Sequence, residues 1–476
     1  MHLPRRTFIA GAAAAGLAVS SRRSAAATDT PVRPEDFGAK GDGVTNDTAA
    51  FAALAAAINA RGGGTIELRP TTYVVGAQDR GFGRADGYAY FPAPVMELVG
   101  CTSPLIIRGN GAVLRCAPKL RFGTFNPATG EPSRRAMPNF ALGEMSGPYR
   151  FMIKAERCSG PVEIHDLELD GNIDQMILGG PWGDTGWQLP GTGLGLVENM
   201  GSELVRNVYA HHHPLDGVLI NGVDRDRGTA SRLEKVRCEY NGRQGCSIVG
   251  GQRYVFVDSA FSHTGRSKVV SAPGAGVDIE GERKKVADLS FVGCRFSNNH
   301  GPGLLADQGQ SEGSRFDRCT FIGTTSWSAW PGNPGMRFDN CRFVGPIVQA
   351  FGDAAHPQRA AHFADCLFLD DPALSPTGQV YIGANTDGPI GDLPNNPNVV
   401  FSRCAFRLTH KAVLPWTTNV VTFADCTMSQ RSPKQSFPRG HFVGSNTISG
   451  NVDLYSAIID GDVVLNGRRL PRRTVG

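Results

Sequence analysis

The segments LDGVLIN (215–221), RQGCSIV (243–249), GAGVDIE (274–280) and GPGLLAD (301–307) repeat one pattern, a glycine followed by a short run rich in apolar residues. The glycines at the third position, Gly217, Gly245, Gly276 and Gly303, are spaced by 28, 31 and 27 residues. A period of this length is typical of a solenoid, in which each coil stacks on the one before it. We therefore expect one continuous solenoid with these segments as equivalent strands of successive coils.

Alternate residues of a strand point to opposite faces, so each segment divides into an inner and an outer set. The inner set is apolar and is predicted to line the interior of the coils: Val218, Cys246, Val277, Leu304, Ile220, Ile248, Ile279 and Ala306. The outer set carries Asn221, Asp278, Glu280 and Asp307. The repeat thus predicts an acidic cluster on the outer surface of one sheet.

Seven of the eleven cysteines follow a second pattern, in which a cysteine is followed two positions later by an aromatic residue or a similar one. They are Cys238, Cys294, Cys319, Cys341, Cys366, Cys404 and Cys426. A cysteine and the residue two positions on point the same way, and stacked coils place equivalent positions about 4.8 Å apart. Free cysteine packs as a small hydrophobe, so we expect a buried ladder of free thiols rather than disulfides, metal ligands or redox groups.

The first 27 residues stand apart from the repeats. Arg5 and Arg6 precede an alanine-rich apolar stretch that runs to Val19, and residues 24–27, SAAA, offer a small-residue cleavage site. Twin arginines before a weakly hydrophobic segment are typical of a Tat export signal, and the apolar run is shorter than the roughly 20 residues that a membrane span needs. We expect a signal peptide over 1–27, no membrane insertion, and a periplasmic or secreted mature protein.

The charge of the chain gives no sign of a nucleic-acid partner. The signal peptide contains four arginines and no acidic residue, which accounts for the whole formal charge of +4. The mature chain is therefore formally neutral, and we expect no nucleic-acid binding.

An N-terminal cap is predicted over residues 31–75, before the solenoid proper. The stretch DFGAKGDGVTNDTAAF (36–51) leads into an alanine-rich helix that Asn46 or Asp47 can cap and that the glycines at 62–64 end. The segment TIEL (65–68) is predicted to be the first strand, and residues 430–476 a C-terminal cap.

This opening, with GGGTIEL (62–68) and Thr72-Tyr73, resembles the N-terminal signature of the pectate-lyase-like superfamily. That group includes pectate lyases, polygalacturonases, alginate epimerases and phage tailspikes. The resemblance implies an all-β fold, a single-stranded right-handed parallel β-helix over 31–476 with a helical N-terminal cap. The resemblance does not imply a particular reaction. The sequence also lacks the complete set of motifs that would identify one sub-family.

The carboxylates of the outer set are the candidate catalytic groups. Asp278 and Glu280 are two residues apart on one strand face, about 6.6 Å between Cα atoms, and Asp307 is predicted to occupy the register of Glu280 on the next coil, about 4.8 Å away. Like charges this close raise the pKa of at least one carboxyl group, unless a cation lies among them.

Basic and aromatic residues are predicted to surround this cluster. Arg243 directly precedes its strand, one coil from Asp278, and joins the catalytic candidates. Asn221 of the outer strand set is a candidate substrate-binding residue, and the turns and long insertions supply the others, namely His213, His263, Lys268, His300, Trp182 and Trp187. Cations beside an acidic cluster suit a negatively charged sugar, and tryptophans offer flat platforms for sugar rings.

These residues leave several functions open. Paired carboxylates are typical of glycoside hydrolysis, and we favour an exported monomeric enzyme that hydrolyses an acidic, uronate-containing polysaccharide without a cofactor. In the alternative of a β-eliminating lyase, Asp278, Glu280 and Asp307 would bind Ca²⁺ and Arg243 or Lys268 would be the base. A uronate epimerase and a non-catalytic polysaccharide-binding adhesin are further alternatives.

Overall fold

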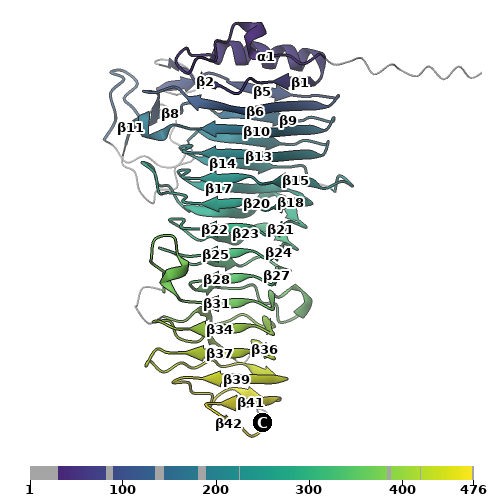
Figure 1. The fold of residues 1–476 in the computed structure, drawn as a ribbon, viewed down its shortest axis with the longest axis vertical. Coiled ribbons are helices and arrows are strands. Elements are labelled where there is room, and N and C mark those ends of the chain that lie inside the picture. The colour runs from purple at the N-terminus through teal and green to yellow at the C-terminus, as the bar shows by residue number, and fades with distance from the viewer. Residues whose placement is uncertain are drawn as a thin grey trace, which may run out of the picture. The chain divides into compact units, whose positions relative to one another are not determined.

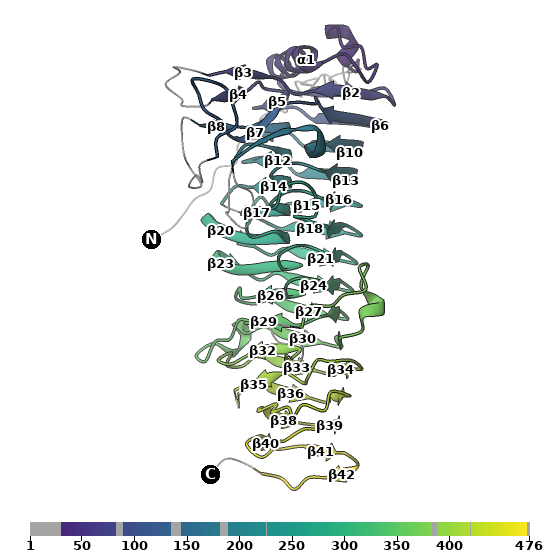
Figure 2. The same ribbon diagram turned by 90° about the vertical axis from the view of Figure 1, so that its left-hand side faces the viewer.

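The computed structural model describes residues 30–81, 89–134, 144–180, 189–224, 226–382, 388–418 and 420–473. From Pro31 onward the chain forms one compact unit. Its strands are stacked along the unit from the N-terminal cap to the last coil, as Figures 1 and 2 show. Within the described residues, no helix combines the length and the apolar character that a membrane crossing requires.

Each coil contributes one strand to the face that carries the glycine-anchored segments. This face is an 11-stranded parallel sheet, which we call sheet C. Its strands, in spatial order, are β5 (Met96–Val99), β9 (Phe151–Glu156), β12 (Thr192–Val197), β14 (Asp216–Asn221), β17 (Gln244–Gln252), β20 (Ala275–Ala287), β23 (Leu304–Glu312), β26 (Ala329–Pro331), β29 (Ile347–Val348), β32 (Gly391–Leu393) and β35 (Trp416–Thr417). The predicted right-handed parallel β-helix is confirmed.

The rest of each coil belongs to a second sheet, sheet A. The first coil contributes two short strands, β1 (Gly64–Glu67) and β2 (Thr72–Val75), which both pair with β6 (Leu105–Cys116). The next coils contribute one long strand each, namely β6, β10 (Val162–Asp170) and β13 (Glu203–His211). Later coils split this strand into a pair, such as β15 (Ser231–Glu234) with β16 (Arg237–Glu239), β18 (Tyr254–Val257) with β19 (Ala260–Ser262), and β21 (Ser290–Val292) with β22 (Arg295–Ser297). Equivalent strands pair in parallel from coil to coil.

The glycines of the repeat are required by the close approach of neighbouring coils. A Cβ atom on Gly217 would lie 2.6 Å from the Asn241 side chain, and one on Gly276 would lie 2.6 Å from the backbone oxygen of Gly303. The residues predicted to be interior are all fully buried, from Val218 and Ile220 to Leu304 and Ala306. The glycine-anchored pattern therefore identified both the coil period and the inner face.

All eleven cysteines are free and buried, as predicted. The ladder, however, contains six of the seven assigned cysteines, because Cys238 lies in register with Phe261 and not with the position of Cys294. Tyr240, two residues after Cys238, accordingly lies outside the coil, where it stacks on His212 and His263. A positive φ of 57° at Tyr240 marks the turn that directs it outward.

Two continuous stacks of phenylalanine fill the later coils beside the cysteines. One runs through Phe256, Phe291, Phe316, Phe338, Phe363, Phe401, Phe423 and Phe442. The other runs through Phe261, Phe296, Phe321, Phe343, Phe368 and Phe406. Successive ring centroids are 4.3 to 5.3 Å apart in the first stack and 4.6 to 5.6 Å apart in the second. Only the second stack was part of the predicted cysteine–aromatic pattern.

The ends of the solenoid are closed differently. Helix α1 (Thr48–Arg61) begins after Asp47 and ends at Gly62, whose φ of 73° terminates the helix. It buries Phe51, Leu54 and Ile58 over the first coil, where it contacts β5 and where Phe51 packs edge-on against Tyr73. Parallel stacking continues far into the predicted C-terminal cap, through β39 (Ser445–Ser449) and β41 (Asp462–Leu465). An antiparallel turn back to β42 (Arg468–Arg469) ends it.

The long insertions between the early coils form a small sheet of their own, sheet B. It contains β3 (Gln78–Arg80), β4 (Tyr90–Pro92), β7 (Arg121–Thr124), β8 (Met145–Ser146) and β11 (Ile177–Gly179). In Figure 2 its labelled strands lie beside the N-terminal coils.

Candidate active site

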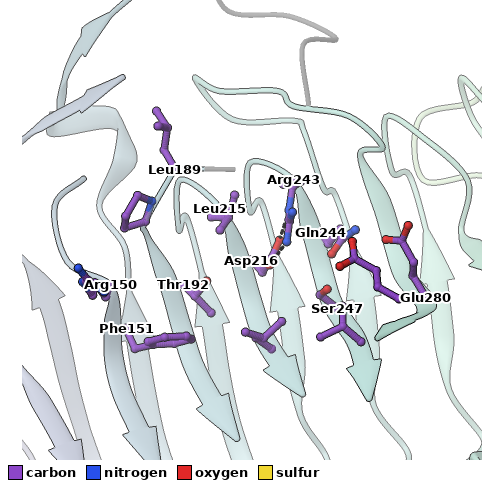
Figure 3. Close-up of a pocket in the computed structure, with 14 residues that line it drawn as sticks. Arg150, Phe151, Leu189, Thr192, Leu215, Asp216, Arg243, Gln244, Ser247 and Glu280 are labelled. Carbon is purple, nitrogen blue, oxygen red and sulfur yellow. Dashed lines mark hydrogen bonds and ion pairs between the residues drawn. The ribbon is translucent and has the colours of Figure 1, made fainter. Parts of the chain in front are cut away.

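A cavity of about 350 Å³ opens on the outer face of sheet C, over the strands from β9 to β20. Its lining residues are Arg150, Phe151, Leu189, Pro190, Thr192, Leu215, Asp216, Leu219, Arg243, Gln244, Ser247, Val249, Glu280 and Glu282. Figure 3 shows that the labelled side chains come from adjacent parallel strands and the turns that lead into them. A volume of this size is within the range of small-molecule sites.

An ion pair between Arg243 and Asp216 forms one wall of this cavity. Arg243 donates from Nε to Asp216 Oδ1 at 2.9 Å and from Nη2 to Asp216 Oδ2 at 2.6 Å. The Asp216 side chain is only 1% exposed and that of Arg243 11% exposed. Burial alone would lower the pKa of Arg243, but the charge of Asp216 and its hydrogen bonds raise it above its ordinary value. Arg243 is therefore a fixed cation.

Arg243 was predicted from the sequence and Asp216 was not, although both lie in the repeat segments. Asp216 directly precedes Gly217, and it pairs in register with Gln244, the residue that follows Arg243. The sequence signal for this ion pair was an acidic residue directly before the repeat glycine on one coil and an arginine two residues before the repeat glycine on the next coil.

Asp278 lies on β20 behind Gln244 and is almost completely buried. Gln244 donates from Nε2 to Asp278 Oδ2, while the Gln244 Oε1 atom is buried without a hydrogen-bond partner. Burial raises the pKa of Asp278 well above its ordinary value, the nearby charge of Glu280 raises it further, and Arg243 opposes the rise. A protonated Asp278 could donate to Gln244 Oε1 after rotation of the amide, which would satisfy both groups.

Glu280 lines the cavity two residues further along the same strand face and is half-exposed. Burial is the main cause that raises the pKa of Glu280, and the charges of Glu282 and Asp307 add to it. Glu282 is exposed and also lines the cavity. The predicted rise in pKa within the acidic cluster therefore occurs at both Asp278 and Glu280.

The predicted register of Asp307 is wrong. Asp278 pairs with Leu305 and Glu280 pairs with Gln308, so two residues, Ala306 and Asp307, stand opposite Ile279 alone. This β-bulge, which a count of residues from the glycine does not reveal, moves Asp307 out of line with Glu280. Asp307 instead lines a second cavity, of about 560 Å³, with Trp330, Gln349 and Asn396.

An aromatic surface lies at the other end of the first cavity. Phe151 on β9 extends over Gly195 of the next strand, where a Cβ atom would lie 2.6 Å from the phenyl ring. Arg150 flanks the ring within the same cavity. The sequence signal for this surface is a glycine in an outward-facing strand position, where a neighbouring side chain can lie flat.

Most of the predicted substrate-binding residues lie elsewhere. His213 is fully buried inside the coil, where its Nδ1 lies 2.7 Å from the Tyr149 hydroxyl, and burial lowers its pKa well below the ordinary value. The predicted contact of His213 with substrate is therefore wrong, because the His213 side chain points into the coil. Lys268 donates to the backbone oxygens of Asp174 and Met176, outside the cavity.

His263, His300 and Asn221 also lie outside the lining of the cavity. His263 belongs to a stack on the turn between sheet A and sheet C, 4.6 Å from the Tyr240 ring. His300 packs against Gly265 and Gly274, and Asn221 pairs with Gly250 at the end of β14. Trp182 and Trp187 lie outside the described residues.

The carboxylates do not form the cluster that the lyase alternative requires. Among the described residues, one group of three or more histidine, cysteine or acidic side chains has ligand atoms that all lie within 4.8 Å of one another, and it is Asp170, His211 and His212. Asp278, Glu280 and Asp307 do not meet this condition. Ca²⁺ binding by these three residues stays a prediction.

Comparison with solved structures returns proteins that are distant in sequence. The A-module of the mannuronan C-5 epimerase AlgE6 of Azotobacter vinelandii is 18% identical with a TM-score of 0.43, over 91% of this chain and 98% of that one. The tailspike gp49 of Acinetobacter baumannii bacteriophage Fri1, a capsular polysaccharide depolymerase, is 13% identical with a TM-score of 0.45, over 94% and 65%. PfbA, a surface adhesin of Streptococcus pneumoniae, is 12% identical with a TM-score of 0.35, over 92% and 91%.

No family model matches the chain, and no curated protein matches it significantly. The three similar structures are an epimerase module, a depolymerase and an adhesin, so the likeness specifies no activity for this chain.

Proposed function

We propose that this protein hydrolyses glycosidic bonds in an acidic, uronate-containing polysaccharide, with Asp278 and Glu280 as the catalytic carboxyl groups. The observation that carries the proposal is the pairing of a buried acid of raised pKa with a half-exposed acid on the same outward strand face, beside a cavity. Two groups of this kind supply the acid and the base that glycoside hydrolysis needs.

The environments of the two carboxyl groups assign their roles. Asp278 is the more deeply buried, so it keeps its proton and is the general acid towards the leaving oxygen. Glu280 reaches the solvent of the cavity and, when ionised, is the base that activates water. Their Cα separation of about 6.6 Å on one strand is compatible with the wider spacing of inverting enzymes, about 6.5–9.5 Å between carboxyl groups.

The approach of Asp278 to a substrate requires a movement of Gln244. Gln244 lines the cavity, whereas Asp278, to which Gln244 is hydrogen-bonded, is not among the lining residues. When substrate displaces this amide, the Asp278 hydroxyl becomes accessible from the cavity.

Substrate binding is proposed to use the cations and the phenyl ring of the same cavity. Nη1 of Arg243 is not used in the pair with Asp216, and it can donate to a uronate carboxylate. Arg150 supplies a second positive charge, and Phe151 offers an apolar face to a sugar ring.

Elimination is less well supported, because the two bases considered for it are committed to other contacts. Arg243 is held as a cation by Asp216, and Lys268 is hydrogen-bonded to backbone oxygens of another coil. Neither can accept the proton at C5 of a uronate without loss of these contacts.

The test is a panel of uronate-containing polysaccharides, assayed for new reducing ends and for absorbance near 235 nm. Hydrolysis gives reducing ends without the absorbance, whereas elimination gives both. The variants Asp278→Asn and Glu280→Gln should each lose a factor of about 10² or more in kcat. Glu312→Gln, which changes an exposed acid on β23 that pairs with Lys285, is the matched control and should keep wild-type activity. Wild-type turnover in both site variants would refute the assignment.

We also propose that residues 1–27 direct export by the Tat route. Conservative replacement of the twin arginines, Arg5→Lys with Arg6→Lys, should leave the protein in the cytosol with its signal peptide uncleaved. Unchanged export of this double variant would contradict the proposal.

A further inference from the structure

A second group of chemically active side chains lies on sheet A, away from the carboxylates of sheet C. Asp170 ends β10 and His211 ends β13, and the two residues are direct partners in the parallel register of these strands. His212 follows at the turn. One ligand atom from each residue lies within 4.8 Å of the other two.

The atoms are arranged for donation to a common point. His211 Nδ1 lies 2.7 Å from His212 Nδ1 and 3.8 Å from Asp170 Oδ1. In a tetrahedral zinc site, bonds of about 2.0–2.1 Å place two ligand atoms about 3.3 Å apart. The two separations from His211 Nδ1 lie on either side of this value, and a ligand atom of His212 also lies within 4.8 Å of one of Asp170. Side-chain rotations can therefore bring one atom of each residue to a single ion.

The groups around the three residues hold them in this orientation. His211 Nε2 lies 3.2 Å from Glu168 Oε1, so this nitrogen can donate to a carboxylate and leave Nδ1 with its lone pair. Metal-binding histidines are usually oriented in this way. Asp170 is held by two donors: Arg115 Nε donates to Oδ2 at 2.8 Å, and the Asn172 backbone N–H donates to Oδ1 at 2.9 Å, which leaves Oδ1 a second lone pair for an ion.

Aromatic stacking fixes the two imidazole rings. The ring centroid of Tyr209 lies 4.1 Å from that of His211, and that of Tyr240 lies 5.0 Å from that of His212. The His211 and Asp170 side chains are 10% and 13% exposed, so a small ion can reach them from solvent.

We propose that Asp170, His211 and His212 bind one divalent transition-metal ion, with Zn²⁺ as the favoured ion. Two imidazole nitrogens and one carboxylate oxygen suit zinc, nickel or copper, whereas calcium and magnesium prefer oxygen ligands alone. Water completes the coordination. The ion links the strand ends of two adjacent coils, and it is independent of the catalytic assignment of Asp278 and Glu280.

The experiment is a titration of the chelator-treated mature protein with ZnCl₂ at neutral pH, in which isothermal calorimetry measures the heat of binding. We expect one equivalent of Zn²⁺ to bind. His212→Ala and Asp170→Asn should abolish this equivalent or weaken it by at least about 100-fold, and Glu168→Gln should weaken it by about 10–100-fold. His356→Ala, which removes an exposed histidine that is paired with Asp353, is the matched control and should bind as the wild type does.

Absence of stoichiometric binding to the wild type would overturn the proposal, as would unchanged affinity in His212→Ala and Asp170→Asn. If a variant fails to fold, the electron paramagnetic resonance spectrum of Cu²⁺ bound to the wild type gives the answer. Hyperfine structure from two nitrogens is expected, and a spectrum with oxygen ligands only would refute the site.

Discussion

Replacement of Asp278 by asparagine should lower kcat by a factor of about 10² or more and at the same time make the folded protein more stable at neutral and alkaline pH. Burial raises the pKa of the native Asp278 carboxyl, whereas in the unfolded chain this group has its ordinary pKa near 4. The contribution of Asp278 to stability is thus fully present below the unfolded pKa and is lost as the pH rises towards the native one. The amide variant cannot ionise and escapes this loss.

The magnitude follows from proton linkage. Over the pH range in which the native carboxyl keeps its proton and the unfolded one has lost it, each pH unit costs the wild type about 1.4 kcal/mol of unfolding free energy. The new amide can also donate to Gln244 Oε1, which lacks a partner in the wild type. The stability difference between variant and wild type should therefore grow with pH by about this slope.

Urea unfolding followed by circular dichroism at pH 5, 6, 7 and 8 measures the slope, and Asp339→Asn, at an exposed aspartate, is the control. The wild type should also release one more proton on unfolding than the Asp278→Asn variant. Parallel pH dependences for the two proteins would mean that the native Asp278 is ionised, and its assignment as the general acid would be refuted.

Three further predictions concern single groups. Arg243→Ala leaves the buried Asp216 carboxylate without its cation and should lower the free energy of unfolding by about 3–5 kcal/mol in urea titrations, whereas a loss below 1 kcal/mol would show that the pair is dispensable. Glu282→Gln removes a charge that raises the pKa of Glu280, so the acidic limb of the kcat/KM–pH profile should move to lower pH, and a shift in the opposite direction would exclude Glu280 as the base. Thiol titration should find few reactive groups in the native protein and most of the eleven after denaturation without reductant, and recovery of none would indicate disulfides.

The sequence predicted the parts of the fold that repeat. The inward direction of Val277 and Ile279 was predicted from their alternation after the glycine. In a strand with one buried face, alternate residues must all point to the same side, so the apolar set is the buried one. The residues that depart from the repeat could not be placed in this way. The bulge at Ala306 and Asp307 and the outward turn at Tyr240 depend on local backbone geometry that the spacing of glycines does not report.

The charged strand residues of the candidate site were predicted from the sequence. The residues that enter the site through contacts between neighbouring coils were not. Asp278, Glu280 and Arg243 come from segments that the repeat aligned. Asp216 and Phe151 enter the cavity through a contact with the next coil, a bidentate ion pair in one case and a ring lying over Gly195 in the other. Contacts of this kind depend on side-chain direction and reach, which a strand pattern leaves undetermined.

The two phenylalanine stacks determine the order in which the coils unfold. Each ring touches its counterparts on adjacent coils, so the cohesion of the later coils is a sum of nearest-neighbour terms, and such a chain frays from its ends inward. The first stack ends at Phe442, which has a neighbour ring on one side only, and the strands beyond it, β41 and β42, carry no ring of either stack. These C-terminal strands and the Phe442 coil should therefore exchange their amide hydrogens before the coils that have ring neighbours on both sides. The coils that carry Asp216 and Glu280 lie many interfaces away, so the cavity can stay intact while the C-terminal coils open and close.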